Sequence, residues 1–104
     1  MVDAGEAERI VRTRALIRDF IEHYTAYAGA AATLALYQRE YGVARENSEA
    51  VSKRVRAGDA PALEYRLATA ELQMLEQEVA AAEQDAATRE RAFATRYRVA
   101  YDAL

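Results

Sequence analysis

The sequence predicts an all-α fold, a long antiparallel two-helix hairpin whose helices meet along coiled-coil-like seams. Apolar and small residues recur at alternating steps of three and four over most of the chain, which is the spacing of a helical seam. One cluster of helix breakers, Gly58-Asp59-Ala60-Pro61, separates the two periodic halves. Charged residues make up 30% of the chain, with only 4 Gly and 1 Pro, and this composition favours long helices over a sheet. The 104 residues are therefore predicted to form a single hairpin, with helix one over about 6–57, the turn at 58–61 and helix two over about 62–104.

The first helix carries a seam whose spacing changes once. Two successive steps of three meet at Leu34, and such a slip predicts local overwinding of the supercoil. A second stripe on the same helix widens its apolar face, which predicts contact with more than one neighbouring helix. The seam is Ile10, Thr13, Ile17, Phe20, Tyr24, Tyr27, Ala31, Leu34, Tyr37, Tyr41, Ala44, Ser48, Val51 and Val55. The stripe is Val11, Ile21, Ala28, Ala32 and Ala35.

The second helix repeats the pattern with one polar step, at Arg89 and Glu90. No useful stretch alternates with period two, so no strand is predicted. The second seam is Tyr65, Ala68, Leu72, Leu75, Val79, Ala82, Ala86, Phe93, Tyr97, Ala100 and Leu104.

The reversal has residues suited to each of its parts. Gly58 can take the left-handed conformation at the end of helix one, where three basic residues in the preceding turn suit the helix dipole. Asp59 is predicted to cap helix two, and Pro61 to lie in its first turn. Within helix one, Gly29 and Gly42 are interpreted as points of close packing against a neighbour.

Composition and charge exclude several classes of function. The 14 basic and 17 acidic side chains are interspersed and no basic face stands out, so a nucleic-acid partner is not expected. The chain has no cysteine, and hence no disulfide or thiolate metal site. No segment is long and apolar enough to span a bilayer, and the acidic start does not resemble a signal peptide. Of the 52% apolar residues many are alanine, so the two helices have a thin core and burial in a larger assembly is expected.

No combination of residues indicates catalysis. His23 stands alone, without the Glu-x-x-His pattern of a metal site in a helical bundle, and is interpreted as a helix-face residue. Ser48 and Ser52 have no histidine within helical reach. We therefore predict no enzyme, no metal and no cofactor. The seven tyrosines are interpreted as seam residues whose hydroxyls reach water, with a lining or subunit-contact role as the alternative. They are Tyr24, Tyr27, Tyr37, Tyr41, Tyr65, Tyr97 and Tyr101.

The turn and its flanks carry a family resemblance. Residues 54–72, from Arg54-Val-Arg-Ala-Gly58 through Leu63-Glu64 to Leu72, resemble the hairpin tip of the TolC-type outer membrane efflux proteins. The upstream stretch 17–24, which ends in a tyrosine, is similar to the segment that enters the long tunnel helix of that family. The likeness covers about residues 8–104, and it leans toward the heavy-metal-efflux branch.

The resemblance implies a periplasmic tunnel hairpin of an outer membrane efflux channel, in contact with sister hairpins and, at its tip, with a periplasmic adaptor (membrane fusion) protein. Ala57 and Gly58 would be the small residues that let the adaptor approach closely. The family also has a second hairpin, barrel strands and a signal peptide, so this sequence is expected to be a fragment, a truncated reading frame, an excerpt or a reduced descendant. The alternative is a free-standing soluble coiled-coil protein that forms homo-oligomers. The tip residues carried over by position are Arg54, Val55, Ala57, Gly58, Asp59, Ala60, Pro61 and Leu63.

Overall fold

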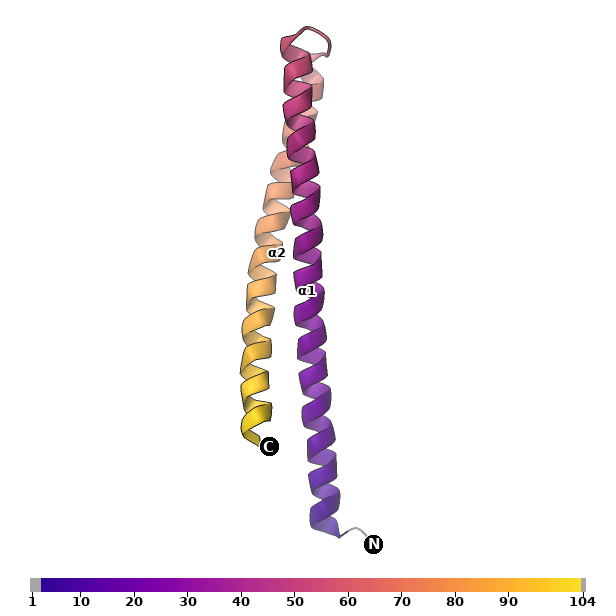
Figure 1. Ribbon diagram of the computed structural model, residues 1–104, viewed down its shortest axis with the longest axis vertical. Coiled ribbons are helices and arrows are strands. Elements are labelled where there is room, and N and C mark those ends of the chain that lie inside the picture. The colour runs from indigo at the N-terminus through magenta and orange to yellow at the C-terminus, as the bar shows by residue number, and fades with distance from the viewer. Residues whose placement is uncertain (1–2, 104) are drawn as a thin grey trace.

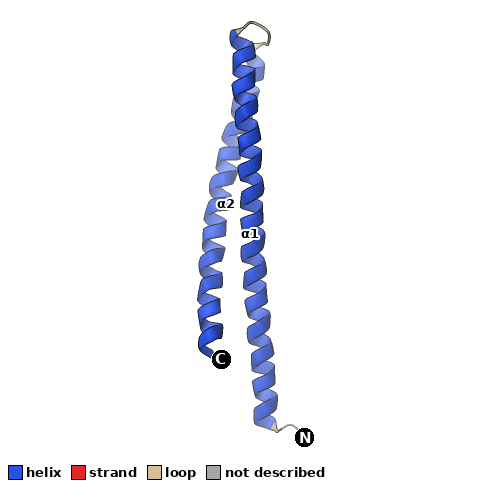
Figure 2. Ribbon diagram, in the orientation of Figure 1, coloured by secondary structure: helices blue, strands red, loops and turns tan. Residues whose placement is uncertain are grey.

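The structure is a computed structural model that describes residues 3–103 as two α-helices joined by a tight reversal. Helix α1 covers Ala4–Arg56 and helix α2 covers Ala62–Ala103. The two helices run antiparallel and side by side away from the reversal (Figures 1 and 2). Within residues 3–103 there is no strand. The predicted all-α hairpin is therefore confirmed.

The hairpin is a thin rod with unequal arms. Its Cα extents are 83 × 21 × 14 Å and its radius of gyration is 23.5 Å, whereas a compact domain of this length would have about 13 Å. Helix α1 has 53 residues and α2 has 42, so α1 continues about 15 Å beyond the end of α2 at 1.5 Å per residue. Figure 1 shows this overhang at the open end. The first turns of α1 thus have no α2 residue beside them.

Helix α1 begins two residues before the predicted start because Asp3 caps it. The Asp3 carboxylate Oδ1 accepts a hydrogen bond from the Glu6 backbone N–H at 2.7 Å, and its carbonyl accepts one from the Ala7 N–H at 3.0 Å. An acceptor at the N-cap followed three residues later by Glu is a recognised start signal. The apolar periodicity alone does not contain this signal, which is why the predicted start lay at about residue 6.

The end of α1 is a Schellman motif built on Gly58. The Asp59 N–H donates to the Arg54 carbonyl at 2.8 Å, and the Gly58 N–H donates to the Val55 carbonyl at 3.1 Å. This pair of bonds requires a left-handed residue between them, and Gly58 has φ = +78°. The predicted role of Gly58 is confirmed. Because two otherwise free carbonyls of α1 are satisfied here, the helix stops at a defined residue.

Helix α2 begins at Ala62, the predicted position, but Asp59 and Pro61 do not have their predicted places. Pro61 lies immediately before Ala62, the first helical residue, rather than inside the first turn, and its carbonyl accepts a hydrogen bond from the Glu64 N–H at 3.0 Å. Asp59, predicted to cap α2, instead gives its N–H to the end of α1. Proline before the first turn is favourable because its fixed φ suits the approach to a helix.

We expect Gly58→Val to lower the free energy of unfolding by about 1–3 kcal/mol, because a β-branched residue is strained at positive φ. Nothing lies within 4 Å of a Cβ built at Gly58, so the effect comes from the backbone and not from a clash. Thermal and urea unfolding followed by circular dichroism measure it. Unchanged stability would contradict the left-handed turn.

Gly29→Ala is the matched glycine substitution and has the opposite expected sign. A Cβ at Gly29 or Gly42 meets no atom within 4 Å, and both lie inside α1 with negative φ. Close packing within this chain is therefore not the reason for either glycine. We expect Gly29→Ala to raise the free energy of unfolding by about 0.5–1 kcal/mol through helix propensity, measured in the same unfolding experiments. A loss of stability would show that Gly29 is packed against a further helix.

The buried part of the hairpin is small, as the alanine-rich composition predicts. No residue among 3–103 falls below 2% relative exposure, and only one large side chain, Leu75, is buried in α2. A core of this size stabilises a fold weakly. The buried residues are Ala30, Ala44, Ser48, Val51, Ala68 and Leu75.

The seam of α1 that faces α2 is regular from Leu16 to Val55, so the predicted slip at Leu34 is wrong. Ala30 is buried where Ala31 was expected, half-buried His23 replaces Tyr24, and half-buried Leu16 replaces Ile17; the predicted members Ile10 and Thr13 are exposed. With these three replacements the steps alternate between four and three without interruption, as in an unbroken coiled coil. We call this set the core seam; each member is buried or half-buried. It consists of Leu16, Phe20, His23, Tyr27, Ala30, Leu34, Tyr37, Tyr41, Ala44, Ser48, Val51 and Val55.

The seam predicted on α2 holds at most positions. Its members from Ala68 to Ala86, together with Phe93 and Ala100, are buried or half-buried. Tyr65 and Tyr97 are exposed by 42% and 53%, and Leu104 lies outside the described residues. The polar step at Arg89 and Glu90 remains exposed.

Candidate interaction surfaces

The tip residues proposed from sequence lie together at one end of the rod. Val55 and Ala60 are half-buried under the reversal, while the remaining tip residues are exposed, with Leu63 at 61%. The tip is held by its backbone hydrogen bonds and by an ion pair between Arg54 Nη1 and Glu64 Oε2 at 3.5 Å. Both side chains of that pair are about half exposed, so it adds little stability. The tip is thus a small, structurally defined surface with one exposed leucine.

Far from the turn, near the end of α2, the two helices are held together by an aromatic cluster centred on Phe93. Its ring centroid lies 5.3 Å from that of Phe20, 5.6 Å from Tyr24 and 5.5 Å from Tyr27. Tyr97 continues the cluster, at 5.9 Å from Phe20. These separations are typical of favourable aromatic pairs. Aromatic residues of both helices therefore replace the alanines that fill the seam nearer the tip.

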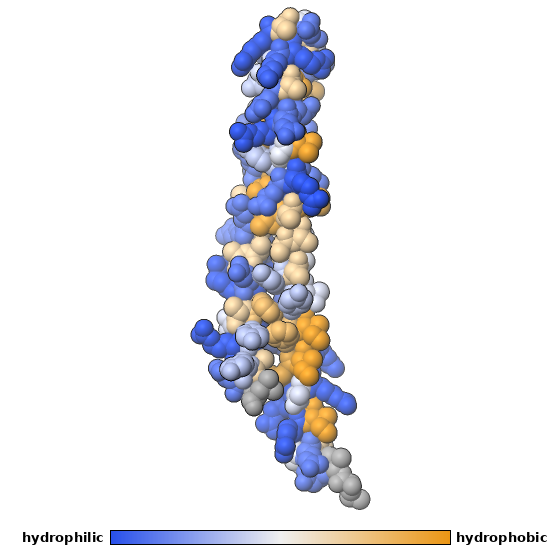
Figure 3. All heavy atoms as spheres, in the orientation of Figure 1, coloured by the Kyte–Doolittle hydropathy of each residue, from blue (hydrophilic) through white to orange (hydrophobic). Residues whose placement is uncertain are grey.

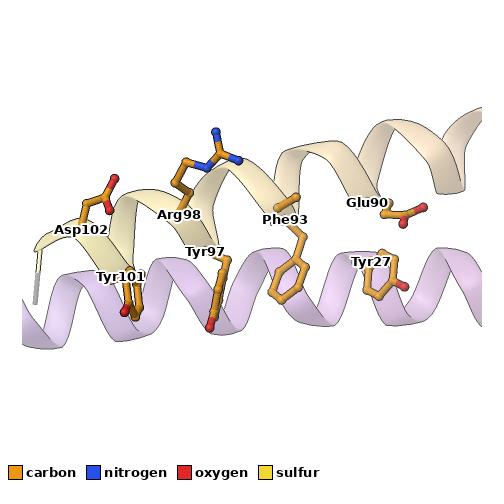
Figure 4. Close-up of a pocket in the computed structure, with 8 residues that line it drawn as sticks. Tyr27, Glu90, Phe93, Tyr97, Arg98, Tyr101 and Asp102 are labelled. Carbon is orange, nitrogen blue, oxygen red and sulfur yellow. The ribbon is translucent and has the colours of Figure 1, made fainter.

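The cluster borders an open groove on one face of the hairpin. Figure 4 shows Phe93, Tyr97 and Tyr101 of α2 directed toward α1, while Arg98 and Asp102 point away from it. A second groove runs alongside, lined by Ile17 and Phe20 from α1 and by Tyr97 and Tyr101 from α2. Tyr97 is 53% exposed and Tyr101 is 69% exposed. This face therefore presents unburied aromatic surface.

Helix α1 carries a second regular line of mostly apolar or small residues beside its core seam. From Ile17 onward, each member lies one residue after a member of the core seam, and two further members continue the same spacing toward the N-terminus. The line is therefore rotated by about 100° around the helix from the core seam. Ile17 lines the aromatic groove and Tyr24 meets Phe93 edge-on, so this line lies on the same face of the hairpin. We call it the lateral seam; all its members except Ala28 are exposed. It consists of Ile10, Arg14, Ile17, Ile21, Tyr24, Ala28, Ala31, Ala35, Gln38 and Gly42.

The lateral seam extends the stripe predicted from sequence. Ile21, Ala28 and Ala35 were predicted to lie on a widened buried face, but α2 leaves Ile21 at 54% exposure and Ile17 at 53%. Figure 3 shows hydrophobic residues gathered on the lower part of the rod, toward the open end. Within residues 3–103, four of the exposed large apolar residues, Ile10, Ile17, Ile21 and Tyr24, thus lie in a row on α1, while the others are distributed over both helices.

Polar contacts tie the two helices together at their edges. Arg96 Nε lies 3.8 Å from Asp19 Oδ2, and the Tyr41 hydroxyl donates to Glu76 Oε1 at 3.3 Å. His23 Nδ1 lies 2.9 Å from the Asp19 carbonyl, which places its half-buried ring in the seam. Within residues 3–103, no group of three or more potential ligand side chains could hold a metal ion. The geometry of His23 is that of a packing residue.

Two further findings concern whether the helices could span a membrane and whether the chain is similar to known proteins. In the described part of the chain, neither helix combines the length and the apolar character needed to cross a bilayer. The chain matches no known protein family, and comparisons with curated proteins and with solved structures find no similar protein.

Proposed function

We propose that this chain is a tunnel hairpin of an outer membrane efflux channel of the TolC type, located in the periplasm. Its sides pack against sister hairpins, and its tip contacts a periplasmic adaptor protein. The observation that carries the proposal is the lateral seam, a long row of mostly apolar or small residues that α2 leaves largely exposed. A helix with two apolar seams is suited to having a neighbour on each side, as a wall of helices requires.

The structure of the tip also supports this role. Its small residues and Gly58 turn allow another helical hairpin to approach the backbone, and Leu63 offers an exposed apolar contact. Apolar residues surrounded by polar ones are common anchors in interfaces of this kind. No titratable cluster or enclosed site is needed for such a role, because the chain acts by helix packing.

Binding of an adaptor hairpin tests the proposal. We expect Leu63→Arg to weaken binding to the purified hairpin domain of a periplasmic adaptor at least tenfold, measured by calorimetry, because an anchor is replaced by a charge. Leu67→Arg is the matched control: Leu67 is exposed by 63%, lies one turn farther along α2 and is outside the tip. Equal binding by both variants, or no binding by the unmodified chain, would contradict the proposed tip contact.

A second candidate, a free-standing coiled-coil protein that forms homo-oligomers, is favoured by one observation. The lateral seam has large residues at one end and small residues at the other, a distribution that can complement itself. The two candidates are separated by mass measurement with and without the adaptor hairpin. A stable homo-oligomer that ignores the adaptor supports the second candidate and contradicts the first.

A further inference from the structure

We infer that the lateral seam binds the lateral seam of a second copy of this chain, in antiparallel orientation and in one register. The inference rests on the homo-oligomeric candidate above and specifies its interface. Its basis is the gradient of residue size along the seam, over a stretch where α2 touches Ile17 and Tyr24 from one side but leaves most of the seam exposed. The large members are Ile10, Ile17, Ile21 and Tyr24, and the small members are Ala28, Ala31, Ala35 and Gly42.

An antiparallel copy can place every large member of the seam opposite a small one. Alternation of large and small residues across a contact is what lets facing side chains interdigitate without voids. In the same register, the seam's two polar residues, Arg14 and Gln38, face each other and share one layer of the contact. The facing pairs are Ile10 with Gly42, Arg14 with Gln38, Ile17 with Ala35, Ile21 with Ala31, and Tyr24 with Ala28.

A parallel copy fits poorly for two reasons. Each residue would face its own equivalent, so isoleucines would crowd at one end while alanines left a gap at the other. Arg14 would also face the partner's Arg14, and like charges in direct opposition are destabilising. Size and charge therefore both favour the antiparallel arrangement.

The residues that flank the seam agree with this register. On the side toward α2, Phe20 lies opposite the partner's Leu34, and Tyr27 lies near the two-fold axis opposite the partner's Tyr27. On the outer side, Arg18 lies opposite the partner's Ala32, over which its aliphatic stem can pack. No like-charged side chains face each other at these positions.

The symmetry of the pair places both α2 helices on the same side, giving a four-helix arrangement. The two seams of α1 are separated by about 100° around the helix, close to the right angle at the corner of a square bundle. A contact over residues 10–42 is about 50 Å long and, with a helix width near 10 Å, covers about 500 Å² of projected area on each partner. That area is near the lower end of specific protein interfaces, so the dimer is expected to depend on concentration.

Disulfide cross-linking tests orientation and register, because the natural chain has no cysteine. We expect Ile17→Cys and Ala35→Cys to form a disulfide-linked dimer when mixed and oxidised, while each variant alone stays unlinked. In the antiparallel register the two thiols face each other only in mixed dimers, within the short reach of a disulfide. Rapid linking of either single variant with itself indicates a parallel or different register and overturns the inference, as does an unlinked mixture.

Sedimentation equilibrium tests the surface independently of cross-linking. The unmodified chain is expected to approach twice its 11.6 kDa mass with rising concentration, and Ile21→Asp to raise the dimer dissociation constant about a hundredfold or more, since each dimer would bury two carboxylates. Val43→Ser is the control, because Val43 is 66% exposed and lies off both seams. A monomer at all concentrations, or equal effects of the two substitutions, overturns the inference. Adaptor binding at Leu63 is read separately, so failure here is distinct from failure of the efflux proposal.

Discussion

Replacement of Leu75 by alanine is expected to lower the free energy of unfolding by about 3 kcal/mol, toward the lower end of the range for buried leucines because the hairpin core is thin. Leu75 is the only large side chain of α2 that is buried, at 7% exposure. The hairpin has few other apolar contacts to compensate, so the loss removes a large share of its core. Urea unfolding followed by circular dichroism measures the change. The slope of the unfolding free energy against urea concentration should be the same for both proteins, which shows that the surface exposed on unfolding is unchanged.

The neighbouring methionine provides the control for this prediction. Met74 has a side chain of similar size but is 56% exposed, so Met74→Ala is expected to change the free energy of unfolding by less than about 1 kcal/mol. A similar loss in the two variants would mean that α2 is rotated relative to the described hairpin, or that Met74 is covered by another molecule.

Phe93→Ala is expected to destabilise the open end by about 3 kcal/mol, combining lost burial with several lost aromatic pairs. Phe93 is the ring on which the aromatic cluster of both helices converges. The effect should be local: amide hydrogen exchange is expected to rise in α1 around Phe20 and in the last turns of α2, but much less near the tip.

Phe93→Leu separates volume from aromatic geometry. Leucine retains most of the apolar area, so about half of the lost stability should return if burial dominates. Uniform acceleration of exchange along the whole hairpin would contradict a local role for the cluster and would show that the two helices unfold as one unit.

The fold followed from the sequence because its signals are local. Steps of three and four, Gly58 and Pro61 each act over a few residues, and they fixed both helices and the reversal to within two positions. The missed start at Asp3 was also a local signal, an acceptor side chain followed by Glu6. Such signals are readable without knowledge of the partner helix.

The assignment of residues to faces was less predictable, since it depends on which neighbour a helix meets. Ala30 and Ala31 are identical neighbours in the sequence, and only the position of α2 decides which of them is buried. The same holds for His23 and Tyr24. Hydropathy favoured Tyr24 as the seam residue, but the polar His23 side chain is the one that lies in the seam. The position of Phe93 within its cluster likewise depends on pairing across the hairpin. The turn brings the tip residues together, so their clustering was predictable from the sequence. The identity of a partner at the tip also depends on the surface of that partner, which this sequence does not encode.

The position of the well-formed reversal has a consequence for how the chain folds. Tyr41 and Glu76, 35 residues apart, meet partway along the rod, whereas Phe20 and Phe93 enclose about twice that length of chain. Each doubling of the length of a closed loop adds about 0.6 kcal/mol of entropic cost. Contacts between α1 and α2 are therefore favoured to form first beside Gly58 and then progressively farther from it. The aromatic contacts around Phe93 are expected to form last. We expect opening to run in the reverse order, so that α1 around Phe20 is the first part of the helix to lose its contacts with α2.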